Sequence, residues 1–225
     1  MDDLPAKDGP ASRRHVFERG ELEFDRLAFF SDAIYAISLT LLVVGLEVPR
    51  VIDTSSNGDL WDALDELEPE ILMFFISFLV IGSFWLSHHR FVARLTAIDR
   101  SLLFCTLCYL AFIAFLPFPS GLLGEYTDNS VAVALYALCI AVVAAIEVVL
   151  FALAYKHDLL TVEPTDETFR WGVVASLTPA LLFFLSIPVA FVSPLLGMLV
   201  WVLNIPIGIL TDRWMPAKAT AYYED

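Results

Sequence analysis

The sequence predicts an all-α integral membrane protein with six transmembrane helices, and three observations support this fold class. Hydrophobic residues make up 58% of the 225-residue chain, above the roughly 45–50% of soluble domains. Six apolar runs each approach the roughly 20 residues that cross a bilayer. Charged residues gather in the two tails and in the segments between these runs. The surplus apolar surface is therefore expected to face the lipid bilayer.

The apolar runs divide the chain into a membrane domain and two tails. We expect an amino-terminal tail at 1–23, a transmembrane domain at 24–211 and a carboxyl-terminal tail at 212–225. The first 23 residues lack the short apolar core and cleavage site of a signal peptide. The first span is therefore expected to stay in the membrane. The six spans are predicted at about 27–48, 71–87, 102–118, 131–155, 171–189 and 195–210.

Basic residues near the ends of the spans predict the orientation, because positive charge is retained in the cytoplasm. The segments predicted to be cytoplasmic carry Arg13, Arg14, Arg19, Arg26, Arg90, Arg94, Arg100, Lys156, Arg170, Arg213 and Lys218. The segments after the first and third spans are acidic, with Asp53, Asp59, Asp62, Asp65, Glu66, Glu68, Glu70, Glu125 and Asp128. This alternation predicts a multi-pass protein of the cell membrane with both termini in the cytoplasm. Proline is expected to kink or break the last two spans, at Pro179, Pro188, Pro194 and Pro206.

Net charge and composition exclude several classes of partner. With 13 Lys and Arg against 27 Asp and Glu, the chain has a net charge of −14 and no basic surface for nucleic acid. The acidic run 59–70 is either a solvated loop or a cation-concentrating surface. Cys105 and Cys108 lie inside an apolar run, where packing is the expected role. We predict no cofactor and no bound metal.

Two acidic residues lie inside predicted spans, namely Asp32 in the first and Glu147 in the fourth. An ionisable group within a membrane usually faces protein or water and has a partner. Each is therefore either a hydrogen-bonded packing residue or part of a functional site. Glu147 has two interpretations, a neutral carboxyl group or a proton relay.

The first span has an apolar stripe, which we call the Ile37 stripe. At about 100° per residue, Ile37, Leu41 and Val44 fall on one face, with Thr40 at its margin. Asp32 falls about 140° away from this face. If the Ile37 stripe lines a pore, Asp32 should point back into its own helical bundle.

Two motifs carry a resemblance to a known family. Arg26, Phe30, Ser31 and Asp32 match the signature R-x-x-x-F-S-D, and the second span carries W-x-x-H-H-x-F, with Trp85, His88 and His89. Together they resemble the prokaryotic Transmembrane Protein 175 potassium channels. Trp85 is either an interfacial residue or the partner of Asp32. The histidines point about 100° apart, poorly placed to share a metal, and one of them is expected to meet Ser31 or Asp32.

The resemblance implies a potassium-selective cation channel, a homotetramer around a central pore lined by the first helix of each subunit. It implies apolar constrictions at Ile37, Leu41 and Val44 and a ring of hydroxyl groups at Thr40. Val44 departs from the leucine expected there, which implies a wider outer constriction. It further implies that the signature, together with Trp85, His88 and His89, holds or gates the first helix. Potassium is the implied permeant ion.

Other functional classes remain to be weighed. A proton- or cation-coupled secondary transporter would use Asp32 and Glu147 as relay carboxylates. No internal repeat typical of such transporters is evident in the spans. A membrane enzyme is disfavoured because neither H-E-x-x-H nor G-x-S-x-G occurs. No T-V-G-Y-G loop occurs either, so ions would be selected by dehydration in an apolar neck.

Overall fold

The computed structural model describes residues 16–216 and residue 219, apart from the side chain of Asp212. Arg13, Arg14 and Lys218, on which part of the predicted orientation depends, lie outside these residues. The helices are α1 (Leu22–Val44), α2 (Asn57–Glu66), α3 (Glu68–Ala93), α4 (Arg100–Phe115), α5 (Pro117–Glu125), α6 (Ser130–Lys156), α7 (Asp166–Ala190), α8 (Pro194–Val202) and α9 (Asn204–Arg213). Two short strands accompany them, β1 (Val16–Glu18) and β2 (Ala97–Asp99).

Six helical segments of the described chain are long and apolar enough to cross a membrane, which confirms the predicted fold class. Four of them are single helices, α1, α3, α6 and α7. The third and sixth crossings are each built from two consecutive helices, α4–α5 and α8–α9. Pro117 begins α5 directly after α4 ends, because proline lacks the N–H that would continue the helix. Pro179 and Pro188 lie within α7, which continues past both.

The bounds of some helices differ from those of the predicted apolar runs. α1 begins at Leu22 and ends at Val44, before Gly45 and Pro49, whereas the apolar run was expected at 27–48. The third crossing continues to Glu125, beyond the expected end at 118. Hydropathy marks only the apolar centre of a span, whereas the helix extends into its charged ends. The division into a domain at 24–211 and two tails remains a prediction.

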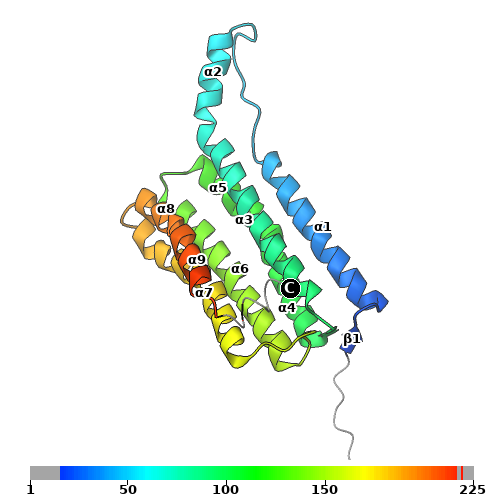
Figure 1. Ribbon diagram of the computed structural model, residues 1–225. Coiled ribbons are helices and arrows are strands. Elements are labelled where there is room, and N and C mark those ends of the chain that lie inside the picture. Colours follow the sequence, from blue (N-terminus) through cyan, green and yellow to red (C-terminus); the bar gives the residue numbers. More distant parts are fainter. Residues whose placement is uncertain (1–15, 217–218, 220–225) are drawn as a thin grey trace, which may run out of the picture.

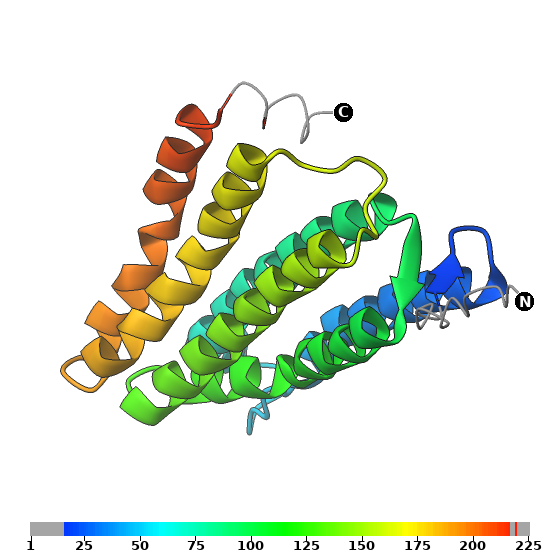
Figure 2. The ribbon, with the colours of Figure 1, turned by 90° about the horizontal axis from the view of Figure 1, so that it is seen from below.

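The helices form a bundle in which α1 lies at one edge and α7 with α8–α9 at the other (Figure 2). α6 packs against both α4 and α7, and a larger share of its residues is buried than in any other of the six segments. Its small buried side chains allow neighbouring helices to approach closely, as at Ala137 and Ala144. A close approach also joins α7 to α8, where a Cβ at Gly197 would lie 2.8 Å from the Cβ of Ala190.

Large apolar side chains cover much of the outer surface of the bundle. Phe75, Leu79 and Phe104 are 58%, 71% and 69% exposed, respectively. Monomeric soluble proteins rarely expose contiguous apolar surface of this kind. The exposed apolar surface is therefore explained by lipid, in keeping with a multi-pass membrane protein.

A small polar assembly joins three segments at the basal end of the bundle, where α1 begins and α3 and α6 end. β1 pairs with β2 in antiparallel register, which ties the start of α1 to the α3–α4 connection (Figure 2). The backbone N–H of Thr96 donates to the carbonyl of Leu159 over 2.9 Å, which adds the α6–α7 connection. Asp99 caps α4 through Leu102 N–H and contacts His157 Nδ1 over 2.6 Å. The basal end of α1 is therefore held by segments distant in sequence.

The acidic run 59–70 is helical, and the interpretation as a loop is wrong. Ser56 caps α2 by accepting a hydrogen bond from the Asp59 N–H, and acidic side chains favour a helix amino terminus. α2 contributes no buried residue and continues almost directly into α3. Figure 1 shows α2 extending beyond the rest of the bundle at the apical end, where α1 ends. Its carboxylates are therefore held on a projecting helix.

Candidate functional site

α1 has one face packed against its own bundle and one face turned outward. The buried face contacts α3, α4 and α5. On the other face Ile37, Leu41 and Val44 are 54%, 45% and 72% exposed. The Ile37 stripe is thus available for contact with lipid, water or another copy of the chain. The buried residues are Phe24, Leu27, Ser31, Tyr35, Ser38 and Leu42, spaced three or four apart.

The hydroxyl groups of Ser31, Ser38 and Thr40 on α1 are satisfied within the helix. Ser31 and Ser38 donate to the carbonyls four residues earlier, over 2.9 Å and 2.8 Å. Thr40 is exposed and donates to the Ile37 carbonyl over 2.9 Å. Because a hydroxyl group has one proton and two lone pairs, the Thr40 oxygen keeps its lone pairs available to a cation.

Asp32 is bound to the neighbouring helix. Trp85 Nε1 of α3 donates to Asp32 Oδ1 over 2.9 Å, and the Trp85 ring lies 5.5 Å from that of His89. Of the two interpretations of Trp85, the structure favours the partner of Asp32. The carboxylate joins α1 to α3, although its side chain remains exposed in the single chain.

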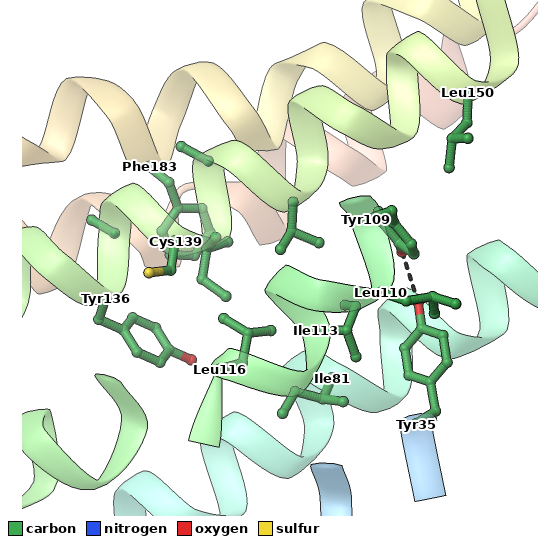
Figure 3. Close-up of a cluster of buried hydrophobic side chains, with 14 of the residues drawn as sticks. Tyr35, Ile81, Tyr109, Leu110, Ile113, Leu116, Tyr136, Cys139, Leu150 and Phe183 are labelled. Atoms are coloured by element: carbon green, nitrogen blue, oxygen red, sulfur yellow. Dashed lines mark hydrogen bonds between the residues drawn. The ribbon is translucent and has the colours of Figure 1, made fainter. Parts of the chain in front are cut away.

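His88 lies in an aromatic cluster with two tyrosines. The hydroxyl groups of Tyr35 on α1 and Tyr109 on α4 are 2.7 Å apart, as Figure 3 shows. His88 is buried, stacks on Tyr109 with ring centroids 5.2 Å apart, and lies 5.9 Å from the Tyr35 ring. Neither ring nitrogen of His88 has a hydrogen-bond partner among the described residues. His88 therefore forms no hydrogen bond to Ser31 or Asp32, because Ser31 bonds its own helix and Trp85 donates to the carboxylate. The prediction that one of the two histidines meets these residues stays a prediction for His89, which lies beside Trp85.

Glu147 on α6 faces the same region of the bundle. Its Oε1 atom is buried and has no hydrogen-bond partner among the described residues. The side chain lies near Ser87 of α3, two residues from Trp85, so both intramembrane acids lie beside the same helix. Together with the aromatic cluster they form a polar layer across α1, α3, α4 and α6.

The remaining signature residues lie apart from this polar layer. Arg26 and Phe30 are exposed on α1. Arg26 precedes Ile37 by three helical turns, so both residues lie on nearly the same face. The structure thus separates the signature into an inward part, Ser31 and Asp32, and an outward part that continues the line of the Ile37 stripe.

Comparison with known proteins decides the family. A family model described as "Endosomal/lysosomal potassium channel TMEM175" matches residues 26–117. A potassium channel of Chamaesiphon minutus is 31% identical over 176 residues, which cover 73% of this chain and 86% of that protein. This chain belongs to the TMEM175 family. Its family is one of ion channels and not of enzymes.

Two further comparisons extend this result. A potassium channel of Streptomyces collinus is 37% identical over 120 residues, and the match covers 52% of this chain and 57% of that protein. The crystal structure of a lysosomal potassium-selective channel TMEM175 homolog from Chamaesiphon minutus superposes with a TM-score of 0.68 at 27% identity. The superposition covers 85% of this chain and 99% of that one. The fold of the TMEM175 family therefore extends over most of the chain.

Sequence reasoning missed two features that support α1. The Tyr35–Tyr109 pair joins residues 74 positions apart. The only local signal was a polar hydroxyl group within each apolar run. The contact between Asp99 and His157 joins residues 58 positions apart, and no motif marks it.

Proposed function

We propose that this chain is a potassium-selective channel through which ions pass passively, and that α1 of each subunit lines a central pore in a homotetramer. The observation that carries this proposal is the exposed Ile37 stripe on the face of α1 opposite its packed face. Family membership and the potassium channels among its relatives add support. One exposed helix face per subunit suits a closed ring of identical chains.

In this proposal Ile37, Leu41 and Val44 form successive apolar rings. Val44 lies seven residues after Ile37, about 10 Å along the axis at roughly 1.5 Å per residue, a length over which a neck can gate by dewetting. An ion entering the rings loses water without gaining ligands, and potassium is dehydrated more readily than sodium. The Thr40 oxygens then offset part of that loss. Isoleucine is stiff at χ1, so its ring keeps its aperture.

Asp32, Trp85, Ser31, His88 and His89 act on the orientation of α1 rather than on the ions. The Asp32–Trp85 hydrogen bond and the tyrosine pair fix its rotation against α3 and α4. A change in these contacts would turn the Ile37 stripe relative to the pore axis. We propose that the basal end is cytoplasmic and that the protein resides in the cell membrane, following its basic residues.

A reconstitution experiment tests the proposed function. Purified protein in planar bilayers with opposed potassium and sodium gradients should pass current that reverses near the potassium equilibrium potential. Imposing a pH gradient alone should leave that reversal potential unchanged. Current that reverses near zero under opposed cation gradients would contradict potassium selectivity.

A coupled transporter using Asp32 and Glu147 is the second candidate. The observation in its favour is that both acids contact α3 near the buried His88, with hydroxyl groups nearby. Obligatory coupling predicts that potassium movement stops when proton movement is prevented. Flux of potassium through vesicles without a compensating proton flux would exclude this candidate.

Neutralising the projecting helix α2 should lower conductance at low salt only. Asp59, Asp62, Asp65 and Glu66 are exposed, whereas Glu70 is partly buried and packs against Gly124. The quadruple variant with Asn and Gln at the four exposed positions should conduct about twofold less at 0.01 M salt. At 1 M salt it should match the parent, because the Debye length falls from about 30 Å to about 3 Å.

The loop acid Asp53 is left unchanged in the quadruple variant. Hydrogen bonds from the Ser55 hydroxyl and N–H hold its pKa below the usual range, so it stays ionised at lower pH than an ordinary aspartate. The quadruple variant therefore keeps one fixed negative charge at Asp53, which still attracts cations. An equal loss of conductance at both salt concentrations would indicate damage to the fold instead.

A further inference from the structure

The segment between the first two membrane crossings exposes apolar side chains outside the spans. Residues 45–67 lie between these crossings. Val48 is 86% exposed, Ile52 is fully exposed, and Trp61 of α2 is 66% exposed. Trp61 precedes Glu68, the first residue of α3, by seven residues, about 10 Å along a helix axis at 1.5 Å per residue. Acyl chains therefore do not account for this apolar surface, which is typical of an interaction site.

One edge of the connection between α1 and α2 has a regular pattern of exposure. The connection runs alongside α2 as a long thread without helix (Figure 1). Val48, Arg50 and Ile52 are exposed, whereas Pro49 and Val51 between them are partly buried. Such alternation is typical of an extended chain, in which every second side chain points to the same side. Val48, Arg50 and Ile52 therefore share one edge, which we call the connection face.

Arg50 is a lone positive charge in acidic surroundings. It is the one Lys or Arg in residues 46–66, which contain six acidic residues. Its side chain is exposed and forms no ion pair with any described residue. The connection face therefore presents an unpaired cation between two exposed apolar side chains.

α2 has the complementary pattern. At about 100° per residue, Leu60, Trp61 and Leu64 fall within an arc of about 100°, and the four acidic residues fall within about 120° on the other side. Asp65 is the acid nearest to Trp61, about 40° away around the helix. α2 contributes no buried residue, and Leu60, Trp61 and Asp65 are all exposed. An apolar edge with a carboxylate beside it is therefore open to a partner.

We propose that the connection face of each subunit binds α2 of the neighbouring copy of this chain, above the membrane. Val48 and Ile52 pack against Leu60 and Trp61 of the neighbouring copy, and the Arg50 guanidinium donates to its Asp65 carboxylate. This contact rests on the homotetramer proposed above. It closes the ring through apical contacts that are separate from the pore.

The proposed pore brings these two surfaces of neighbouring copies together. Val44 ends α1 and forms a ring around the axis, so the connection that follows it begins close to its copies. Val48 comes four residues later, at most about 14 Å of extended chain. The contact joins two different patches, and such a heterologous contact generates closed rings, whereas a patch that binds itself generates pairs. The same contact can therefore be repeated around a ring of four.

Cysteine cross-linking of the full-length protein in detergent tests the contact. Val48→Cys and Trp61→Cys are introduced together in a background in which the three native cysteines are replaced by alanine, and copper phenanthroline is the oxidant. A non-reducing gel should show a ladder of bands up to four chains. Each single-cysteine variant should stay at one chain, because its two cysteines in neighbouring copies do not meet.

The matched control pairs Trp61→Cys with Val192→Cys. Val192 is 82% exposed, close to the 86% of Val48, and it follows α7. α7 is the fifth crossing, so it ends at the same apical end as α1, but it lies at the opposite edge of the bundle (Figure 2). This pair should give no ladder.

Charge reversal tests the pair of Arg50 and Asp65 with the native cysteines in place. Arg50→Glu should lower the equilibrium constant for assembly about fivefold at low salt, the effect of one exposed ion pair, and so should Asp65→Arg. Combining both changes should restore assembly, as measured by mass photometry. Arg50→Glu with Asp59→Arg should not, because Asp59 lies about 160° from Trp61 around α2.

The outcomes separate this contact from the proposed function. Tetramers that show neither the ladder nor the rescue by Asp65→Arg would overturn the contact and leave the proposed pore in place. A two-chain band from a single-cysteine variant would also overturn it, because it indicates a patch that binds itself. A ladder in channels that do not select potassium would support the contact and contradict the proposed function. A parent protein that is monomeric in mass photometry would overturn both.

Discussion

Replacing Ile37 by asparagine is expected to raise total cation conductance and to reduce the preference for potassium over sodium about tenfold. An apolar ring offers no ligand, so each ion pays its dehydration free energy on entry. Asparagine supplies oxygens and admits water, and sodium, the more strongly hydrated ion, benefits most. A tenfold loss corresponds to about 1.4 kcal/mol and moves the reversal potential under opposed sodium and potassium by about 59 mV.

Val43→Asn is the matched control for this prediction. Val43 is 53% exposed on α1, against 54% for Ile37, but it lies about 120° around the helix from Ile37. The same substitution therefore introduces the same polarity on another face of the same helix. If Val43→Asn changes selectivity as much as Ile37→Asn, or if Ile37→Asn changes nothing in intact oligomers, then the Ile37 stripe does not line the pore.

Loss of the Asp32–Trp85 hydrogen bond is expected to lower open probability or assembly, with ion selectivity unchanged. The bond joins α1 to α3 over 2.9 Å, and Asp32 lies on the side of α1 away from the Ile37 stripe. Breaking this hydrogen bond should weaken the packing of α1 against α3 by about 1–2 kcal/mol. This value lies at the lower end of the range for hydrogen bonds to charged acceptors, because the carboxylate is exposed. That cost corresponds to roughly a 5- to 30-fold shift in the affected equilibrium.

Three variants separate the charge of Asp32 from its hydrogen bond. Asp32→Asn keeps an acceptor and removes the charge, Asp32→Ala removes both, and Trp85→Phe removes the donor. If the hydrogen bond is what matters, Asp32→Ala and Trp85→Phe should have similar effects on open probability, and the double variant should add little. Fully additive effects, or altered selectivity with normal gating, would assign Asp32 a different role.

The fold class could be predicted from the sequence because hydropathy is a local property. A run of roughly 20 apolar residues has no stable place but a bilayer, and the periodicity of a helix fixes which side chains share its face. Periodicity alone placed Ile37, Leu41 and Val44 on one face of α1, whereas their exposure in the structure shows that this face is turned outward. The family resemblance likewise depended on short motifs within α1 and α3.

Contacts between helices were decided only by the tertiary structure. Trp85 and His88 lie three residues apart on α3, yet one bonds Asp32 and the other stacks on Tyr109. Which partner each side chain meets depends on the rotation and separation of packed helices, which no local pattern specifies. The same reason applies to the Asp99–His157 contact and to β1, whose only partner strand in the described chain lies some 80 residues away along the sequence. The sequence by itself therefore determined that α1 is long and apolar enough to cross the membrane and which residues share a face with Ile37, whereas the packing of α3, α4 and α5 against α1 decided that this face is turned outward and what holds it in position.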